Sequence, residues 1–215
     1  MHETFPASPA CIETIASDKF CRGGARAWPV PLPTAGMSKN ETACSKTPSS
    51  RPLVFLDLDD VLCLNSPYGG YDVVVAPRPE DLWVKLFAQR AVNILLAAIE
   101  EYRPRVVLTT SWLRLLDRQS FQGVFQATGL GQLADCLHEH WDAPQNSGET
   151  RLEAIERWLL RHHRGEPFVV LDDTLSGTGL AGSRIDLMGR LVLCEVNVGL
   201  HAGHVAAIHR ALQGS

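Results

Sequence analysis

The sequence predicts an α/β fold, with a parallel central sheet that helices cover on both faces. Two short apolar runs, Leu53–Leu56 and Phe168–Leu171, each end in acidic residues, and a third run at 105–108 ends in hydroxyl residues. Continuous apolar runs of this length are typical of strands that are buried on both sides. Ligands of open α/β sheets bind at the carboxyl ends of the strands, so these polar residues are candidates for a site.

Composition limits the class of protein. The chain has 215 residues, of which 45% are apolar, which is enough for one domain with a sizeable core. No apolar run approaches the roughly 20 residues of a membrane span, and the start of the sequence lacks a secretory signal pattern. Six cysteines without paired CxxC spacing predict neither a disulfide framework nor a zinc site. We expect a cytoplasmic protein with reduced thiols and no membrane partner.

The first 52 residues differ from the rest of the chain. They contain seven of the 13 prolines and little hydrophobic periodicity, so we predict a disordered leader at 1–52 and a folded domain at 53–215. The whole chain has a net charge of −4 and the leader carries about +2, which leaves about −6 on the domain. An acidic domain is a poor non-specific binder of nucleic acid.

Acidic residues follow the first predicted strand. Asp57, Asp59 and Asp60 fall within four positions, and carboxylates this close repel one another unless a cation compensates them. Oxygen ligands of this kind suit Mg²⁺. One carboxylate can act as a covalent nucleophile, and a second one two positions later can act as acid and base. The alternative is a strand that ends in a solvated acidic turn.

The next segment predicts a flap and one helix. Turn residues followed by a β-branched run at 65–75 favour a hairpin over the site. Apolar residues at helical spacing predict one core-facing helix over 79–102, ending before Pro104. Only about forty residues separate the first two strands, which leaves no room for a large cap domain.

The second strand, over 105–112, ends in Thr109, Thr110 and Ser111. Hydroxyl groups and the amides of a following helix can bind phosphate. Thr109 is the first candidate for the phosphate-binding hydroxyl and Thr110 the second. The alternative is that Ser111 caps the helix and both threonines are merely buried.

Residues 117–150 carry weak signals, with a short strand or helix near 133–137. The pair His138-x-His140 lacks further ligands at diagnostic spacing, so it does not predict zinc. At the end of this region, Thr150 and Glu153 form a capping-box signature that places Arg151 in the first turn of an amphipathic helix.

The last elements complete the predicted domain. A strand over 167–174 ends in Asp172 and Asp173, a further strand follows at 191–196, and a final helix is expected over about 201–212.

These motifs resemble a known superfamily. Asp57-x-Asp59-x-Val61 is similar to the first motif of the haloacid dehalogenase-like hydrolases, and the Thr109, Arg151 and Asp172-Asp173 positions are similar to the next three. The order, together with Ser111-Trp112 and Val198-Gly199-Leu200, resembles the domain found in Swiss army knife RNA repair proteins, over about 53–212. Two departures stand out: arginine replaces the usual lysine of the third motif, and Asp60 replaces a common glycine, where its charge is expected to tighten metal binding or to perturb the loop.

The resemblance implies a three-layer Rossmann-like fold with little or no cap domain, and a Mg²⁺-dependent phosphatase that works through an aspartyl-phosphate. The implied roles are Asp57 as nucleophile, Asp59 as acid and base, Thr109 (or Thr110) and Arg151 at the phosphate, and Asp57, Asp172, Asp173 and the Asp59 backbone carbonyl at the metal. A nucleic-acid end with a terminal phosphate is one implied substrate. The alternatives are a small-molecule nucleotidase, which the acidic surface favours, and a non-catalytic phosphate-binding or regulatory module. The sequence names no protein partner.

Overall fold

A computed structural model describes residues 51–214. Except for its last two residues, the leader expected at 1–52 lies outside these described residues. Within them, no helix is long and apolar enough to cross a membrane.

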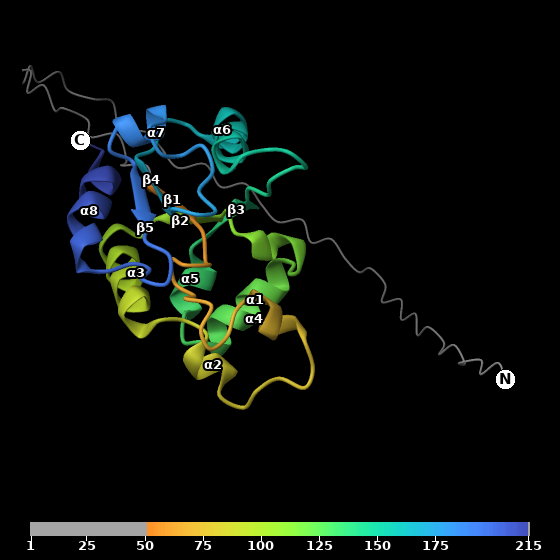
Figure 1. The fold of residues 1–215 in the computed structure, drawn as a ribbon. Helices are drawn as coiled ribbons and strands as arrows, with labels where there is room; N and C mark the ends of the chain where they lie inside the picture. Colours follow the sequence, from red (N-terminus) through yellow and green to blue (C-terminus); the bar gives the residue numbers. More distant parts are fainter. Residues whose placement is uncertain (1–50, 215) are drawn as a thin grey trace, which may run out of the picture. The chain divides into compact units, whose positions relative to one another are not determined.

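A parallel sheet forms the centre of the fold, as predicted, and it has five strands (Figure 1). The strands lie in the order β3-β2-β1-β4-β5, so the direction of winding reverses beside β1. Their bounds are Leu53–Leu56 for β1, Arg105–Leu108 for β2, Leu137–Asp142 for β3, Phe168–Asp173 for β4 and Leu191–Cys194 for β5.

Each face of the sheet has its own apolar core, because successive side chains of a strand point to opposite sides. Val54 and Leu56 of β1 belong to one core, and Leu53 and Phe55 belong to the other. All four are buried, which explains why the sequence shows a continuous apolar run instead of an alternating one.

Helices cover both faces and complete three layers (Figure 1). Side chains of six α-helices contribute to the first core: α1 (Gly70–Val74), α2 (Leu82–Lys85), α3 (Gln89–Tyr102), α4 (Arg118–Ala127), α5 (Gly131–Asp135) and α8 (Val205–Gln213). Side chains of two helices share the second: α6 (Arg151–His162) and α7 (Arg184–Leu187). Short 3₁₀ helices, η1 (Ser111–Arg114) and η2 (Ala202–His204), follow β2 and precede α8.

The flap between β1 and β2 differs from the prediction. The hairpin expected at 65–75 is wrong, because Gly70–Val74 forms the short helix α1, whose Asp72 carboxylate accepts the Gly69 N–H at 2.8 Å. A Cβ on Gly70 would lie 2.4 Å from the Trp112 ring, so this turn fits closely over η1.

The single helix expected over 79–102 is also wrong, because it is divided into α2 (Leu82–Lys85) and α3. Ala88 is extended, and its N–H donates to the Leu62 carbonyl at 2.8 Å. This bond ties the start of α3 to the loop after β1. Among the described residues, only α1, α2 and α3 lie between β1 and β2, so there is no cap domain there.

Residues 117–142 contain more regular structure than their sequence indicates. α4 and β3 were not predicted, and α5 covers most of the short element expected near 133–137. β3 lies at the edge of the sheet and has exposed polar side chains, so it lacks the continuous apolar run of a central strand.

Candidate active site

The carboxyl ends of β1 and β4 meet where the winding of the sheet reverses, and acidic residues come directly after or at the end of both strands. Asp57 follows β1, and its N–H donates to the Leu171 carbonyl of β4 at 2.9 Å. Asp172 and Asp173 end β4. The crevice at such a reversal point is where open parallel sheets bind ligands.

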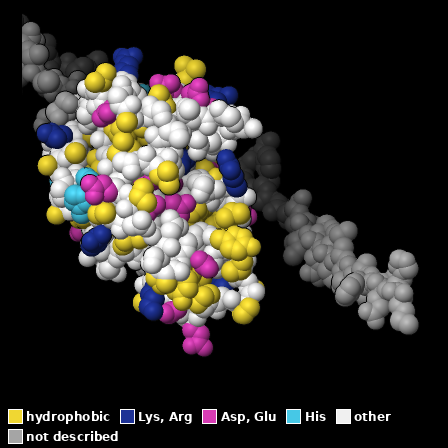
Figure 2. Space-filling view, viewed as in Figure 1, with side chains coloured by type: hydrophobic (Ala, Val, Ile, Leu, Met, Phe, Trp, Pro, Cys, Tyr) yellow, Lys and Arg dark blue, Asp and Glu magenta, His cyan; other side chains and the backbone are white. Residues whose placement is uncertain are grey.

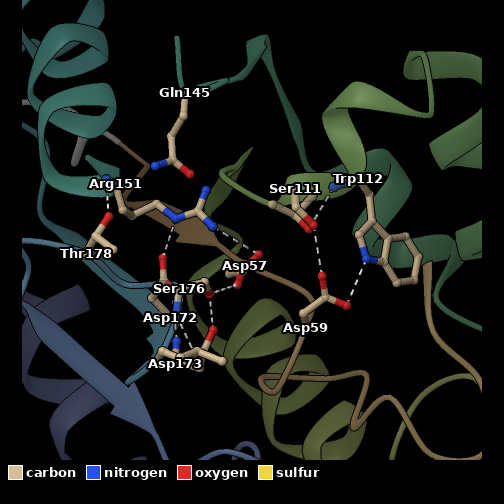
Figure 3. A network of polar contacts seen from close by, with 12 residues as sticks. Asp57, Asp59, Ser111, Trp112, Gln145, Arg151, Asp172, Asp173, Ser176 and Thr178 are labelled. Carbon is tan, nitrogen blue, oxygen red and sulfur yellow. Dashed lines mark hydrogen bonds and ion pairs between the residues drawn. The ribbon is translucent and has the colours of Figure 1, made fainter. Parts of the chain in front are cut away.

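Asp57, Asp172 and Asp173 form a buried carboxylate cluster (Figure 3). One oxygen of each lies within 4.8 Å of the others. The side chains are at most 1% exposed, so water does not screen their repulsion. The sequence predicted that these three residues come together.

Arg151 is the cation that lies against this cluster. Its Nη2 lies 3.6 Å from Oδ1 of Asp57, and its Nε lies 2.9 Å from Oδ2 of Asp172. Neither carboxylate oxygen accepts an aligned hydrogen bond from any residue of the described range 51–214, so these contacts are ion pairs whose donor and acceptor capacity is still available. Arg151 itself is 2% exposed.

The sequence around Arg151 explains its position. Thr150 accepts the Glu153 N–H at 3.2 Å, and Glu153 accepts the Thr150 N–H at 2.7 Å, which is the predicted capping box. Arg151 is therefore the first residue of α6, and its N–H donates to Oγ1 of Thr178 at 2.9 Å. The loop after β4 thus helps to hold the start of the helix beside the cluster.

One guanidinium does not compensate three carboxylates. Burial raises the pKa of Asp57 to about 6, although Arg151 lowers it, and Asp59 raises it further. Burial also raises the pKa of Asp172 to about 8, with the charge of Asp57 as the second cause. The donor set consists of oxygen alone and carries excess negative charge, which fits a divalent metal ion.

Ser176 belongs to the cluster, although the sequence analysis missed it. Its Oγ lies 3.0 Å from Oδ2 of Asp57 and 3.3 Å from Oδ1 of Asp172, and it also contacts Oδ2 of Asp173. A hydroxyl has one proton and can satisfy one of these acceptors at a time. A serine three positions beyond an Asp-Asp pair gives no signal of this role by itself.

Asp59 lies apart from the cluster and faces η1 (Figure 3). Ser111 Oγ donates to its Oδ2 at 3.0 Å, and Trp112 Nε1 donates to its Oδ1 at 2.9 Å. Both carboxylate oxygens are therefore fixed in direction. The Ser111-Trp112 pair is part of the resemblance, but its bonds to Asp59 were not predicted.

The two threonine candidates differ in their contacts. Thr109 is fully buried, and its Oγ1 has no hydrogen-bond partner among the described residues. Thr110 Oγ1 accepts the Trp112 N–H at 3.4 Å and caps η1. Thr110, and not Ser111, is thus the cap, and Thr109 is the residue with an unused hydroxyl.

Asp60 does not join the carboxylate cluster. It has a φ of +52°, a left-handed conformation that aspartate tolerates better than most residues with a side chain. Its Oδ1 accepts the Asn197 N–H at 2.7 Å, which ties the loop after β1 to the loop after β5. Asp60 therefore offers no ligand to the cluster, and the expected effect of its charge on metal binding stays a prediction.

The site combines an Asp-x-Asp pair after β1 with an Asp-Asp pair at the end of the neighbouring parallel strand, β4. Only short helices and α3 lie between β1 and β2 in the described chain. These features define a haloacid dehalogenase-like domain without a cap. The family model described as "HAD domain in Swiss Army Knife RNA repair proteins" matches residues 53–205. The chain belongs to this family, which implies hydrolase activity of the phosphatase kind in general. A search of curated proteins and a search of solved structures each gave no match.

Proposed function

We propose that the chain is a Mg²⁺-dependent phosphohydrolase that acts through an aspartyl-phosphate. The observation that carries the proposal is the buried cluster of Asp57, Asp172 and Asp173 with Arg151 at the carboxyl ends of β1 and β4. A cation would compensate the negative charge of this cluster. Cations also stabilise the charge on the oxygens of a phosphate monoester during its hydrolysis, so one bound cation would serve both.

The proposed reaction has two steps. A carboxylate oxygen of Asp57 attacks phosphorus, and the bond from phosphorus to the leaving oxygen breaks as Asp59 gives that oxygen a proton. Asp59 then removes a proton from water, whose oxygen attacks phosphorus and releases phosphate and the Asp57 carboxylate. Arg151 holds the phosphoryl oxygens, and the free hydroxyl of Thr109 is the better of the two threonine candidates to donate to them.

Mg²⁺ would be held by Asp57, Asp172 and Asp173, with the backbone carbonyl of Asp59 as the further ligand that the superfamily implies. When bound, it supplies positive charge to the phosphoryl oxygens. Ser176 lies within hydrogen-bonding distance of all three carboxylates and is placed to orient them.

For the substrate, we propose a terminal phosphate of a nucleic acid. The family description names RNA repair proteins. The flap is short, and Figure 2 shows hydrophobic side chains gathered where Figure 1 labels α1 and α2. Tyr71 of α1 is 71% exposed and Val84 of α2 is 83% exposed. Exposed aromatic and apolar groups beside an uncapped site suit the bases of a long substrate.

The test is the hydrolysis of p-nitrophenyl phosphate with Mg²⁺ and with EDTA. Asp57→Asn should lower kcat by at least about 10³-fold, as losses of covalent nucleophiles do. Asp60→Asn is the matched control, because it makes the same chemical change three residues away and keeps an acceptor for Asn197. Unchanged turnover in Asp57→Asn excludes the covalent aspartate, and no Mg²⁺-dependent turnover in the parent favours a non-catalytic module.

The substrate class is tested separately. Oligonucleotides with a 3′- or 5′-phosphate should give higher kcat/KM than nucleoside monophosphates. The reverse order would favour a small-molecule nucleotidase.

A further inference from the structure

A second polar pocket lies at the opposite end of the sheet from the carboxylate cluster. It has a volume of about 240 Å³, and we call it the basic pocket. The side chains that define its chemistry are Arg105, Arg161, Arg164, His138, His140 and His162. Arg105 begins β2, whereas Thr109 of the candidate active site follows the same strand four residues later. At about 3.3 Å per residue the two sites are about 13 Å apart along the sheet.

The arginines of the basic pocket outnumber the carboxylates that line it. Across residues 51–214, the guanidinium groups of Arg105, Arg161 and Arg164 form no ion pair. Arg51 also lines the pocket, and its guanidinium donates to the backbone carbonyls of Arg103 and Pro104. Two acids, Glu139 and Glu166, line the pocket as well, so four arginines exceed the acids by two positive charges.

The floor of the basic pocket is His138, which is 6% exposed. Its Nδ1 accepts the His140 N–H at 2.9 Å, so the neutral ring carries its proton on Nε2. That Nε2–H has no hydrogen-bond partner among the described residues. Trp158 packs against the edge of this ring at 5.1 Å and donates to the His140 carbonyl, so the ring is held in place.

The end of α6 does not account for this arrangement. Arg161 and His162 lie in its last turn, where positive charge is favourable. Arg105 and His138 come from two strands, and no helix end explains them. The His140 and His162 rings stack at 3.9 Å, which adds a further wall with ring N–H donors.

We propose that the basic pocket binds a tetrahedral oxyanion of the phosphate class. The guanidinium groups supply charge and paired donors, and His138 Nε2–H supplies a fixed donor at the floor. The volume suits a phosphate group with water and is below the usual range for drug-sized ligands, so a whole nucleotide is not enclosed. The bound group is either a phosphate of a phosphodiester chain or a free phosphate ion.

The position of β3 makes a phosphodiester chain a reasonable source. β3 is the edge strand, and its second residue, His138, lines the basic pocket. The loop that follows it contains Gln145, which lies next to Arg151 in Figure 3. A chain that followed this edge would have phosphates at both sites. The proposal itself does not require the candidate active site to be catalytic.

The test follows histidine ring signals by NMR in the full chain, during titration at constant ionic strength. One arm uses inorganic sulfate, and the other uses a short oligonucleotide without terminal phosphates. Sulfate should shift the His138 and His162 signals in a saturable way. Arg105→Gln and Arg161→Gln should each weaken this binding at least about tenfold, because each removes charged hydrogen bonds. Saturation by the oligonucleotide as well identifies the phosphodiester source, and saturation by sulfate alone identifies free phosphate.

Two control variants distinguish binding in the basic pocket from a general charge effect and from binding at the candidate active site. Arg118→Gln removes the same charge from a neighbouring arginine that donates to the Glu139 carbonyl but does not line the pocket, and it should change the affinity less than twofold. Arg151→Gln alters the candidate active site and should leave the His138 shift intact. The proposal is wrong if sulfate causes no saturable shift, if Arg118→Gln weakens binding as much as the pocket variants do, or if Arg151→Gln abolishes the shift.

Discussion

At the scale of single residues, Arg151 shows how one side chain can serve both the apo fold and the proposed chemistry. It pairs with two buried carboxylates, and it occupies the first turn of α6, where the superfamily usually has lysine. Arginine has a planar group with several fixed donors and lysine has a single charged centre, so the exchange is not neutral at such a site.

Arg151→Ala should lower kcat/KM at least about a hundredfold, because a charge-stabilising donor in a shielded site contributes about 3 kcal/mol or more. Arg151→Lys should retain partial activity. Arg157→Ala on the same helix is the control, because Arg157 pairs with Glu149 at 2.8 Å and should be neutral for activity. Parent-like activity in both Arg151 variants would show that the phosphate-binding cation lies elsewhere.

Trp112→Phe should separate proton transfer from the rest of the reaction. The change removes the donor to Asp59 and keeps a ring against Phe87. We expect kcat to fall about tenfold for an alkyl phosphate, whose leaving oxygen needs a proton, and to change less than about twofold for p-nitrophenyl phosphate.

Trp141→Phe is the matched control, because Trp141 packs on Phe121 and does not contact Asp59. Equal losses with both substrates in Trp112→Phe would mean that Trp112 has only a packing role.

Most of the carboxylate cluster could be predicted from sequence, because Asp57, Asp172 and Asp173 come directly after or at the end of apolar runs, and strand ends meet at one edge. Ser176 and the contacts of Asp59 could not. A hydroxyl or an indole in a loop or a short 3₁₀ helix has no periodicity, and its direction depends on turns that only the folded chain defines. The separation of Asp60 from the carboxylate cluster could not be predicted either, because sequence reveals neither its left-handed backbone nor its bond to Asn197.

At the scale of elements, the start of α6 is where stability and the site are coupled. Its capping box fixes the first turn, and Arg151 is the first residue of that turn. The same capping signature made this helix predictable. α1 and the division of α2 from α3 were not predictable, because they depend on contacts of Gly70 and Ala88 with segments distant in sequence.

Thr150→Ala should lower the free energy of unfolding by about 1 kcal/mol, the usual effect of losing a cap, and should also lower kcat/KM because Arg151 loses its fixed position. Asp117→Ala removes a similar cap from α4, where Asp117 accepts the Ser120 N–H at 2.8 Å. It should cost similar stability without loss of activity. Equal activity in the two variants would show that the cap of α6 does not position Arg151.

At the scale of the whole molecule, the fold concentrates negative charge in its interior, and metal binding should therefore affect global stability. The pKa values of Asp57 and Asp172 are raised from 3.8 to about 6 and about 8. The folded metal-free state then binds more protons than the unfolded state between about pH 4 and pH 8. These two carboxyl groups contribute fully to the free energy of unfolding of the metal-free protein below about pH 4. Their contribution is lost as the pH rises through 6 and 8.

We expect Mg²⁺ to stabilise the parent more at pH 8 than at pH 5, because binding to the folded state alone shifts the unfolding equilibrium. Chemical denaturation with EDTA and with Mg²⁺ at both pH values measures this. Burial lowers the pKa of His138, His162 and His204, and these shifts change the free energy of unfolding with pH in the opposite direction. Each result is therefore compared with the same measurement on Asp172→Asn. A parent that loses no more stability than Asp172→Asn between pH 5 and pH 8 in EDTA would contradict the prediction.

The direction in which the Asp60 carboxylate points determines how many metal ions the carboxylate cluster should bind. Besides Asp59, the sequence has four acids near the ends of β1 and β4: Asp57, Asp60, Asp172 and Asp173. Asp60 does not join the other three, because its carboxylate accepts the Asn197 N–H. Three carboxylates and one guanidinium remain, with a sum of two negative charges, which a single divalent ion balances. We therefore expect a stoichiometry of one ion per chain at this site.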